Sequence, residues 1–517
     1  MRAARLISVA LLLGACDRLG PKGHEWELIE SLAIVEPLSP PLDRSNKHAG
    51  DARAEALGHA FYFDADFSGQ STLIDMLGRS VATPPGRAPK GERMKIACVS
   101  CHDPARGGSD HTSSAEVSIG AGAYDVNSQP TINSAFNDLW YWNGRNDSLW
   151  AQIVAVDESP VSMGGNRLRT MWRVADAYRA PFEALAGPLP VSRGIAAQKA
   201  LLGPDGSCLL DAQNACPAGD CAVDTATVAG QPSCWPRFPL EGRPGSKTGC
   251  QRGDATEPFG DAFDCMAAAD KDAVTGVYVA WAKMIAAYER TLVSQDSAFD
   301  RWVKERNADL LSTALSDAAE RGARLFVGKA ACIECHRGKL LTDFGFHDIG
   351  VPQDGAFVPT EDACTAGLAR CDCTAGKSCL PWGLFDGLSK LKTNAFRRDG
   401  KWSDDPTDDS RAHWTALDLT TEAGLATKRT WKTPSLRDVA LTAPYMHNGR
   451  YATLRDVLEH YNWGGHPGLG TRDPQIVPLD LSDDDLQDLE AFLTSLTGAP
   501  MPIAQVTAPE LPPPSAF

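Results

Sequence analysis

Two copies of the pattern C-x-x-C-H carry the clearest chemistry in this sequence. They are Cys98-Val99-Ser100-Cys101-His102 and Cys332-Ile333-Glu334-Cys335-His336. Two thiols at this spacing add to the two vinyl groups of a haem, and the histidine that follows binds its iron. A disulfide beside a histidine and half of a zinc site are the alternatives. The repetition favours two covalently bound c-type haems. Their attachment points are Cys98, Cys101, Cys332 and Cys335, and their axial ligands are His102 and His336.

The segment before Cys16 has the pattern of a targeting signal. Basic residues precede the apolar run 6–13, which is too short to span a bilayer as a helix. The run ends in Leu13-Gly14-Ala15-Cys16, which resembles the lipobox of bacterial lipoproteins. We therefore expect a lipoprotein signal peptide at 1–16 and an exported, periplasmic protein anchored to a membrane by a lipid on Cys16. An ordinary secretory signal that is cut nearby is the alternative.

Ten further cysteines fall into two clusters. The first comprises Cys208, Cys216, Cys221, Cys234, Cys250 and Cys265, and the second comprises Cys364, Cys371, Cys373 and Cys379. Even numbers are what intramolecular disulfides require, and disulfides persist in exported proteins. The clusters therefore predict up to five disulfides in two loop-rich insertions. A metal cluster is the alternative, but few histidines lie nearby.

The composition excludes several classes of protein. The chain has 517 residues, of which 43% are hydrophobic and 22% charged, and its formal net charge is -16. These proportions exclude wholesale disorder and a polytopic membrane protein. The acidic balance argues against nucleic acid as a partner, because a phosphate-backbone binder needs a basic face.

The patterning indicates a mainly α protein with two cytochrome c-like haem domains and Cys-rich loop insertions. A helix with a core-packing stripe is predicted by the spacing of Trp281, Met284, Ile285, Tyr288 and Leu292. A second helix is predicted to begin at Ser482, because Asp485 completes a capping box there. The expected segments are a tether at 17–50, a first haem domain at 51–310 with an insertion at 203–265, a second haem domain at 311–500 with an insertion at 355–425, and a Pro-rich tail at 501–517.

Several stretches outside the haem motifs support a family resemblance. They are Ala56-Leu57-Gly58, Phe63-Asp64, Pro130-Thr131, Trp142-Asn143-Gly144-Arg145, Phe346-His347-Asp348-Ile349-Gly350-Val351-Pro352, Thr433-Pro434-Ser435-Leu436-Arg437 and Thr442-Ala443-Pro444-Tyr445-Met446-His447-Asn448-Gly449. With the haem motifs, they resemble the bacterial di-haem cytochrome c peroxidase family, and particularly its MauG-type branch. The resemblance covers most of residues 55–187 and 270–500.

The resemblance implies different roles for the two haems. The domain at 51–310 would hold the peroxidatic haem, which reacts with hydrogen peroxide, and the domain at 311–500 would hold the electron-transfer haem. Trp142 matches the tryptophan that lies between the two haems in this family. An indole in that place relays an electron between metal centres that are too far apart for fast direct transfer. Residue type alone would make Trp142 a core aromatic.

Two positions resemble the MauG-type branch. Peroxidase members close the first haem with a distal histidine, and here Ala121 stands in that place, so we expect an open, five-coordinate haem. Those members use methionine as the sixth ligand of the second haem, and here that position is Tyr461, as in MauG-type proteins. A phenolate is a hard anionic donor that favours oxidised iron. His460, His466 and Met446 are the alternative ligands.

The distal glutamate of the family is absent. Its position is Ser162, and a serine hydroxyl cannot replace a carboxylate as acid or base near neutral pH. Asp157 and Glu158 are the nearby carboxylates that would act instead. The expected catalytic positions are therefore Trp142, Ser162 and Glu158.

The resemblance further implies one calcium ion between the domains, held by an asparagine side chain and two backbone carbonyls. Thr442 and Pro444 match the carbonyl positions. A strict count puts the asparagine position at Ser128, one residue from Asn127. Oxygen ligands suit calcium. The expected ligands are Asn127, Thr442 and Pro444, and a water-filled turn is the alternative.

Two hypotheses for the function follow. The first is a peroxide-using di-haem oxidoreductase that takes electrons from a small redox protein or from a protein substrate. The second is a di-haem electron-transfer protein or sensor without peroxidase activity. Ala121 and Tyr461 favour the first hypothesis, and Ser162 favours the second. Docking of a partner by the Cys-rich insertions is compatible with both.

Overall fold

The computed structural model describes residues 23–517, except 85, 114–116, 205, 218, 229–230, 246–260, 354–355, 358, 360–363, 366–370, 373–378, 467–471 and 516. The expected signal peptide with Cys16, and also Cys250 and Cys373, lie outside the described residues.

The described chain is mainly α-helical, as the sequence predicts. The α-helices are α2 (His24–Ser31), α3 (Ala52–Phe63), α4 (Leu149–Asp157), α5 (Arg167–Ala177), α6 (Arg179–Ala186), α7 (Ile195–Lys199), α8 (Asp261–Asp264), α9 (Ala268–Glu289), α10 (Ala298–Asn307), α11 (Asp317–Val327), α13 (Leu384–Thr393), α14 (Ala412–Ala416), α15 (Glu422–Leu425), α16 (Leu454–Asn462), α17 (Asp483–Ser495) and α18 (Ile503–Val506). Short 3-10 helices are η1 (Ala65–Phe67), η2 (Cys98–Ser100), η3 (Pro104–Arg106), η4 (Ser134–Phe136), η5 (Cys332–Glu334) and η6 (Val439–Leu441).

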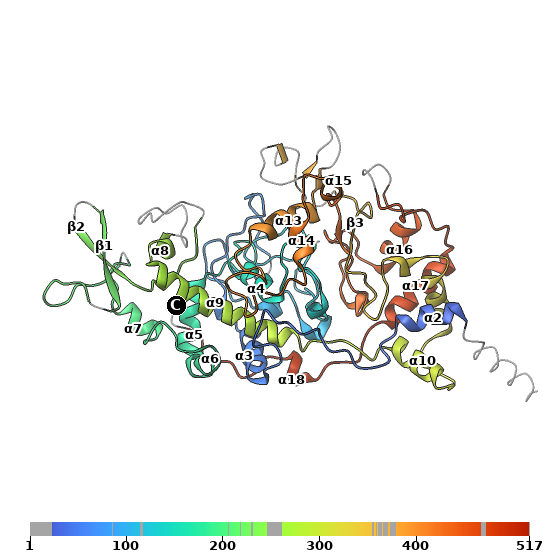
Figure 1. The fold of residues 1–517 in the computed structure, drawn as a ribbon, viewed down its shortest axis with the longest axis horizontal. Helices are drawn as coiled ribbons and strands as arrows, with labels where there is room; N and C mark the ends of the chain where they lie inside the picture. Colours follow the sequence, from blue (N-terminus) through green and yellow to red (C-terminus); the bar gives the residue numbers. More distant parts are fainter. Residues whose placement is uncertain are drawn as a thin grey trace, which may run out of the picture.

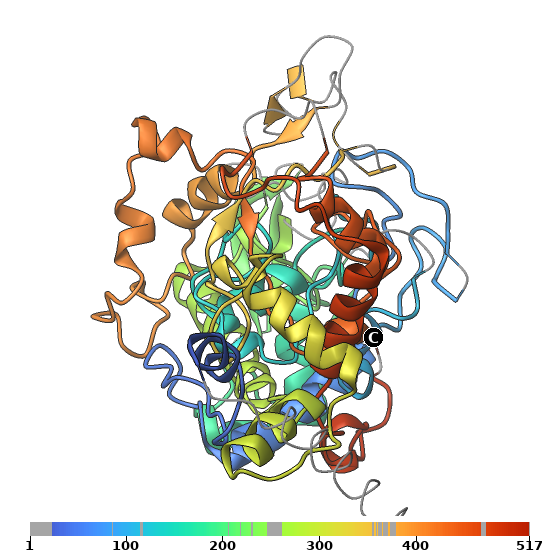
Figure 2. The same ribbon diagram turned by 90° about the vertical axis from the view of Figure 1, so that its right-hand side faces the viewer.

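The strands form small antiparallel pairs. They are β1 (Cys221–Val228) with β2 (Gln231–Pro236), β3 (Phe346–His347) with β6 (Trp431–Lys432), and β4 (Cys371–Asp372) with β5 (Leu380–Pro381). The molecule is elongated, with the β1–β2 hairpin at one end and α2, α10, α16 and α17 at the other (Figure 1). Figure 2 shows that second end facing the viewer.

The first hydrophobic core forms around α9, which packs against α3, α4 and α5. Trp281, Met284, Ile285 and Tyr288 are all buried, which confirms the predicted helix and its core-packing stripe. Leu292, the last residue of that stripe, is buried as well but lies beyond the end of the helix at Glu289. Gly58 allows α3 to approach α9, because a Cβ at this position would lie 1.8 Å from the backbone oxygen of Met284.

The second core forms where α11 packs against α17. Gly322 permits this contact, since a Cβ there would lie 2.0 Å from the backbone oxygen of Asp488. Ser482 caps α17 and exchanges hydrogen bonds with Asp485, which confirms the predicted capping box.

Both ends of the described chain differ from the tether and tail that the sequence suggested. Helix α2 buries Trp26 and Ile29 in the second core, because these apolar residues share one helix face. The C-terminal segment packs on the first half of the chain. There Ser515 N donates to the Asp66 carboxylate at 2.6 Å, and Arg173 donates to the Pro513 carbonyl at 3.0 Å.

The insertion at 355–425 is not only loop. Helix α13 buries Leu384, Leu388 and Leu391 against Leu139 of the first half and forms a small third core. The 3.6-residue spacing of these leucines lies within a polar segment, which is why the local composition suggested a loop.

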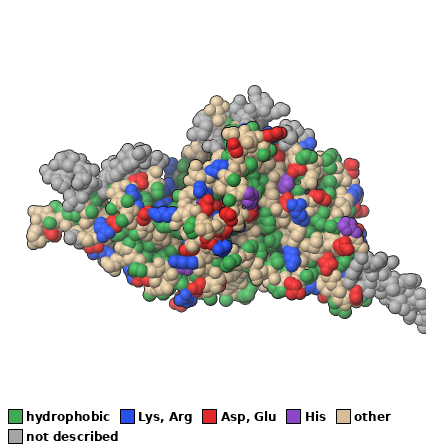
Figure 3. Space-filling view, viewed as in Figure 1, with side chains coloured by type: hydrophobic (Ala, Val, Ile, Leu, Met, Phe, Trp, Pro, Cys, Tyr) green, Lys and Arg blue, Asp and Glu red, His purple; other side chains and the backbone are tan. Residues whose placement is uncertain are grey.

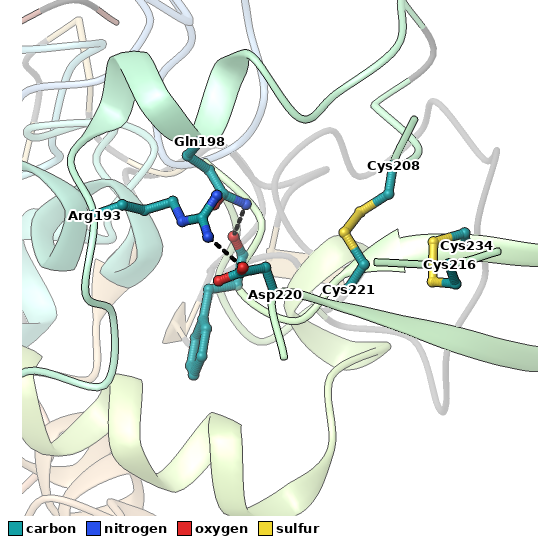
Figure 4. Close-up of a disulfide and its surroundings, with 8 residues drawn as sticks. Arg193, Gln198, Cys208, Cys216, Asp220, Cys221 and Cys234 are labelled. Atoms are coloured by element: carbon teal, nitrogen blue, oxygen red, sulfur yellow. Dashed lines mark hydrogen bonds and ion pairs between the residues drawn. A yellow bond between two sulfur atoms is a disulfide. The ribbon is translucent and has the colours of Figure 1, made fainter. Parts of the chain in front are cut away.

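Disulfides form within each of the two predicted cysteine clusters. Cys208 pairs with Cys221 and Cys216 with Cys234 in the first insertion (Figure 4), and Cys364 pairs with Cys371 in the second. Cys265 and Cys379 are disulfide-bonded as well. These pairings confirm the disulfide interpretation. The first insertion is held to α7 by the carbonyl of Phe238, which accepts from Gln198 Nε2 at 3.2 Å.

Two surface properties concern the expected partners. On the face shown in Figure 3, basic and acidic side chains are interspersed over the described part of the chain. In the same part of the chain, no helix has both the length and the apolar character that crossing a membrane requires.

Candidate haem-binding sites

The first C-x-x-C-H motif lies in one tight turn, η2. His102 N donates to the Cys98 carbonyl at 2.9 Å, and the Ser100 hydroxyl accepts from Ala97 N at 3.1 Å. This turn places Cys98, Cys101 and His102 on the wall of one mostly apolar cavity. Both cysteines are free of disulfides.

The histidine of this motif is held in a form that suits metal binding. Burial lowers the pKa of His102, which favours the neutral imidazole that ligates iron. Tyr62 fixes the local backbone, because its hydroxyl donates to the His102 carbonyl at 2.5 Å. Two free thiols and a neutral imidazole beside an apolar cavity fit a covalently attached haem.

The second motif has the same local construction in η5. Cys332 and Cys335 are free of disulfides, and His336 N donates to the Cys332 carbonyl at 2.9 Å. His336 Nδ1 is 2.9 Å from the Leu341 carbonyl, an acceptor that fixes the protonated nitrogen and leaves Nε2 for a metal. This donor set also fits a c-type haem.

Tyr461 lies on α16 near the two cysteines of the second motif. Burial, together with the proximity of Cys332 and Cys335, raises the pKa of the Tyr461 phenol well above its usual range. A bound metal ion acts in the opposite direction and favours the phenolate.

The alternative ligands for the second haem are placed differently. His460 has both ring nitrogens engaged, with Nε2 3.0 Å from the Ile349 carbonyl and Nδ1 3.0 Å from the Tyr451 hydroxyl. His466 is exposed. Met446 is half-buried in left-handed backbone, with φ of 72°. The engagement of both ring nitrogens counts against His460 as a ligand.

Trp142 forms part of the wall of the first cavity and also contacts the second half of the chain. Its indole Nε1 donates to the Asn127 carbonyl at 2.9 Å, and its own carbonyl accepts from Lys432 N at 2.9 Å. Lys432 is buried, and burial lowers the pKa of its amine to about 7. The indole is 8% exposed, so its position is fixed by packing as well as by hydrogen bonds.

The predicted distal positions come together. Ala121 N donates to the Ser162 carbonyl at 2.6 Å, and Ser162 lines the cavity. Gly120 makes this approach possible, because a Cβ there would lie 2.3 Å from the Ser162 carbonyl oxygen. Ala121 is fully buried and brings no metal-binding atom to the site.

The two carboxylates suggested as substitutes lie elsewhere. Both carboxylate oxygens of Glu158 accept from Arg167, at 2.7 and 2.8 Å. Asp157 is fully buried 3.4 Å from the Thr170 hydroxyl, and burial raises the pKa of its carboxyl to about 7. Neither residue is part of the described cavity wall.

Sequence reasoning missed a third carboxyl group. Glu289, at the end of α9, lines the cavity and is 4% exposed. Its position one residue after Tyr288 of the predicted core stripe was the available signal, because a helix face that packs in a core also buries its flanking residues.

Two of the expected calcium ligands, Asn127 and Pro444, meet across the two halves. Asn127 Nδ2 is 2.7 Å from the Pro444 carbonyl oxygen, and Asn127 N donates to the His447 carbonyl at 2.6 Å. The Thr442 hydroxyl donates to the Val439 carbonyl at 3.0 Å. An asparagine side chain and backbone carbonyl oxygens are thus adjacent here, and calcium prefers ligands of both kinds.

The chain is similar to di-haem peroxidases over most of its length. The sequence profile of the family described as "Di-haem cytochrome c peroxidase" matches residues 52–202. Cytochrome-c peroxidase IdrP2 of Denitromonas iodatirespirans is 25% identical over 469 residues, which are 90% of this chain and 87% of that protein. Methylamine utilization protein MauG of Methylorubrum extorquens is 26% identical over 423 residues, covering 81% of this chain and 76% of that protein.

A solved structure shares the fold. The diheme peroxidase BthA of Burkholderia thailandensis superimposes with a TM-score of 0.50 at 19% identity, covering 89% of this chain and 91% of that one. The resemblance expected from the haem motifs is thereby confirmed. The chain therefore resembles the bacterial di-haem cytochrome c peroxidase and MauG family and is an oxidoreductase of the peroxidase type.

Proposed function

We propose that the protein is a di-haem c-type oxidoreductase that reacts with hydrogen peroxide at the first haem and exchanges electrons with the second haem through Trp142. The observation that carries this proposal is the position of Trp142, which lines the first cavity and is hydrogen-bonded to Lys432 in the second half. Each haem, when bound, supplies a redox-active iron.

We assign the following roles to the residues of the two sites. Cys98 and Cys101 hold the first haem and His102 its iron, while Cys332 and Cys335 hold the second haem, with His336 and Tyr461 on its iron. Ala121 leaves the first haem without a histidine on its open side. Trp142 passes one electron at a time between the two sites. The electrons come from a small redox protein or from a side chain of a protein substrate.

Two further expectations belong to the same proposal. We propose that Asn127, Thr442 and Pro444 hold one calcium ion, because the Asn127 side chain and the Pro444 carbonyl are adjacent. We also propose that the chain is exported to the periplasm and carries a lipid on Cys16. We further propose that it folds into two domains, each of which holds one haem.

The test is rapid mixing of the fully oxidised, haem-loaded protein with one equivalent of hydrogen peroxide. We expect rapid bleaching of the ferric Soret band without added reductant. An unchanged spectrum over minutes would contradict the proposal. It would favour a di-haem electron-transfer protein or sensor, for which the replacement of the distal carboxylate by Ser162 is the motivating observation.

A further inference from the structure

The first cavity contains one carboxyl group among its described lining residues, and it is Glu289. This residue ends α9, the longest described helix, which runs along the first core (Figure 1). Its side chain is 4% exposed, and no hydrogen-bond or ion-pair partner for it is found in the described part of the chain. A buried, unpartnered carboxyl that faces a cavity is costly to keep charged.

The groups that surround Glu289 do not compensate a negative charge. Burial first, and then the Glu289 carboxyl, raises the pKa of Tyr62 from α3, Tyr288 from α9 and Cys98 from η2. All three are therefore neutral near neutral pH. The nearest guanidinium in sequence, Arg290, donates instead to the Pro41 carbonyl at 2.6 Å.

The other two acids considered, Glu158 and Asp157, do not line this cavity. Glu158 is paired with Arg167, and Asp157 is enclosed against Thr170 and Gly165. Asp157 contributes to the field at Cys98, as Glu289 does, and both carboxyls raise the pKa of that thiol. Glu289 is thus the acid that is both close to the attachment point of the first haem and in contact with the cavity.

We propose that Glu289 is the redox-linked proton site of the first haem, which binds a proton when the iron is reduced and releases it when the iron is oxidised. The inference rests on the first haem of the proposed function and deepens it. One electron passes from the donor protein, or from a mediator dye, to ferric iron, which becomes ferrous. One proton passes from water to a carboxylate oxygen of Glu289, so charge in the buried site stays constant.

The direction follows from electrostatics. Ferric haem carries one more positive charge than ferrous haem, so its field lowers the pKa of a nearby carboxyl. In the haem-free chain, burial raises the pKa of Glu289 to about 8. Between the pKa of the oxidised and of the reduced state, the midpoint potential falls as pH rises, and outside that window it is flat.

The experiment is a spectroelectrochemical titration of the haem-loaded protein over a series of pH values. We expect the midpoint potential of the first haem to fall with rising pH in the wild type and to lose that slope in Glu289→Gln. The second haem serves as an internal reference. Glu55→Gln is the matched control, since Glu55 is a half-buried glutamate of α3 outside the cavity wall. An undiminished slope in Glu289→Gln would overturn the inference.

A second measurement covers failure of Glu289→Gln to fold or load haem. The redox infrared difference spectrum of the wild type should contain a protonated carboxyl band that shifts in Glu289→Asp. Absence of such a band would overturn the inference equally. The peroxide reaction is tested separately from the proton site. A protein that does not respond to peroxide but whose midpoint potential depends on pH would have the proton site without the peroxide chemistry.

Discussion

The indole of Trp142 donates a 2.9 Å hydrogen bond to the Asn127 carbonyl, and the Asn127 side chain in turn reaches the Pro444 carbonyl at 2.7 Å. One short connection therefore joins the wall of the first cavity to a segment 317 residues further along the chain. The expected relay residue and two of the expected calcium ligands, Asn127 and Pro444, belong to the same contact between the two halves.

Replacement of Trp142 should slow electron exchange between the haems. Phenylalanine fills similar space but is much harder to oxidise, so we expect Trp142→Phe to slow the exchange by about tenfold or more, a barrier increase of at least ~1.4 kcal/mol. Rapid-mixing spectra after one equivalent of peroxide measure this rate. Trp140→Phe is the matched control, because Trp140 is also buried and lines the cavity. Equal rates in the two variants would remove Trp142 from the relay.

Replacement of Tyr461 should change the ferric spectrum of one haem only. Loss of the phenol removes the proposed anionic ligand of the second haem, which should raise the midpoint potential of that haem. The check is the absorption and electron paramagnetic resonance spectra of Tyr461→Phe. Tyr451→Phe is the control, since its hydroxyl binds His460. A Tyr461→Phe spectrum identical to that of the wild type would exclude this ligand.

Asp157 should make stability depend on pH. Burial first, and then Glu158, raises its pKa to about 7 from the usual value of 3.8, so the folded state binds a proton that the unfolded state has lost. The free energy of unfolding therefore falls as pH rises through this window. The wild type should therefore lose stability between pH 4 and pH 8, and Asp157→Asn should not. We expect the difference in free energy of unfolding between Asp157→Asn and the wild type to shift by roughly 1–4 kcal/mol in favour of the variant over this range. Denaturant unfolding at both pH values measures it, with exposed Asp484→Asn as the control.

The disulfides of the first insertion should stabilise that insertion locally. Cys208–Cys221 and Cys216–Cys234 close loops with sequence separations of 13 and 18, and each cross-link is worth about 3 kcal/mol in the chain-entropy account. Serine at all four positions should make the insertion sensitive to proteases. The ferric spectra should stay unchanged, because no described residue of 203–265 lines the first cavity. Altered haem spectra would show that the insertion supports the haem site.

Two glycines should respond oppositely to alanine. At Gly58 the new Cβ would meet the Met284 backbone oxygen, so Gly58→Ala should destabilise the protein by about 1–3 kcal/mol or more. At Gly276, within α9, the nearest atom is 3.8 Å away on Trp402, so Gly276→Ala should be neutral or stabilising by about 0.5–1 kcal/mol. Thermal unfolding of both variants checks the contrast.

The sequence was most informative where a local pattern determines the structure. The C-x-x-C-H spacing, the α9 stripe and the Ser482 capping box are each defined within a few residues, and the helices form as predicted. The cysteines of each cluster are also close in sequence and even in number, so their pairing into disulfides could be predicted from a local pattern.

Long-range contacts were beyond local patterns. The core stripe marks Glu289 as the neighbour of a buried helix face, but no local pattern shows that its carboxyl faces a cavity that Ser162 also lines. The pairing of Glu158 with Arg167 depends on how α4 and α5 are joined. The local sequence of α2 suggests a tether because the partners of α2, such as Asn307 at a separation of 281 residues, lie far along the chain.

Each end of the described chain packs on the half that is more distant in sequence: α2 on the second core, and residues 513–515 on the first half. Helix α2 is made first, yet its core partners in α11 and α17 emerge hundreds of residues later, and residues 513–515 complete the first half only when synthesis is nearly finished. A fragment that contained one haem motif alone would therefore lack a segment that packs on its own half.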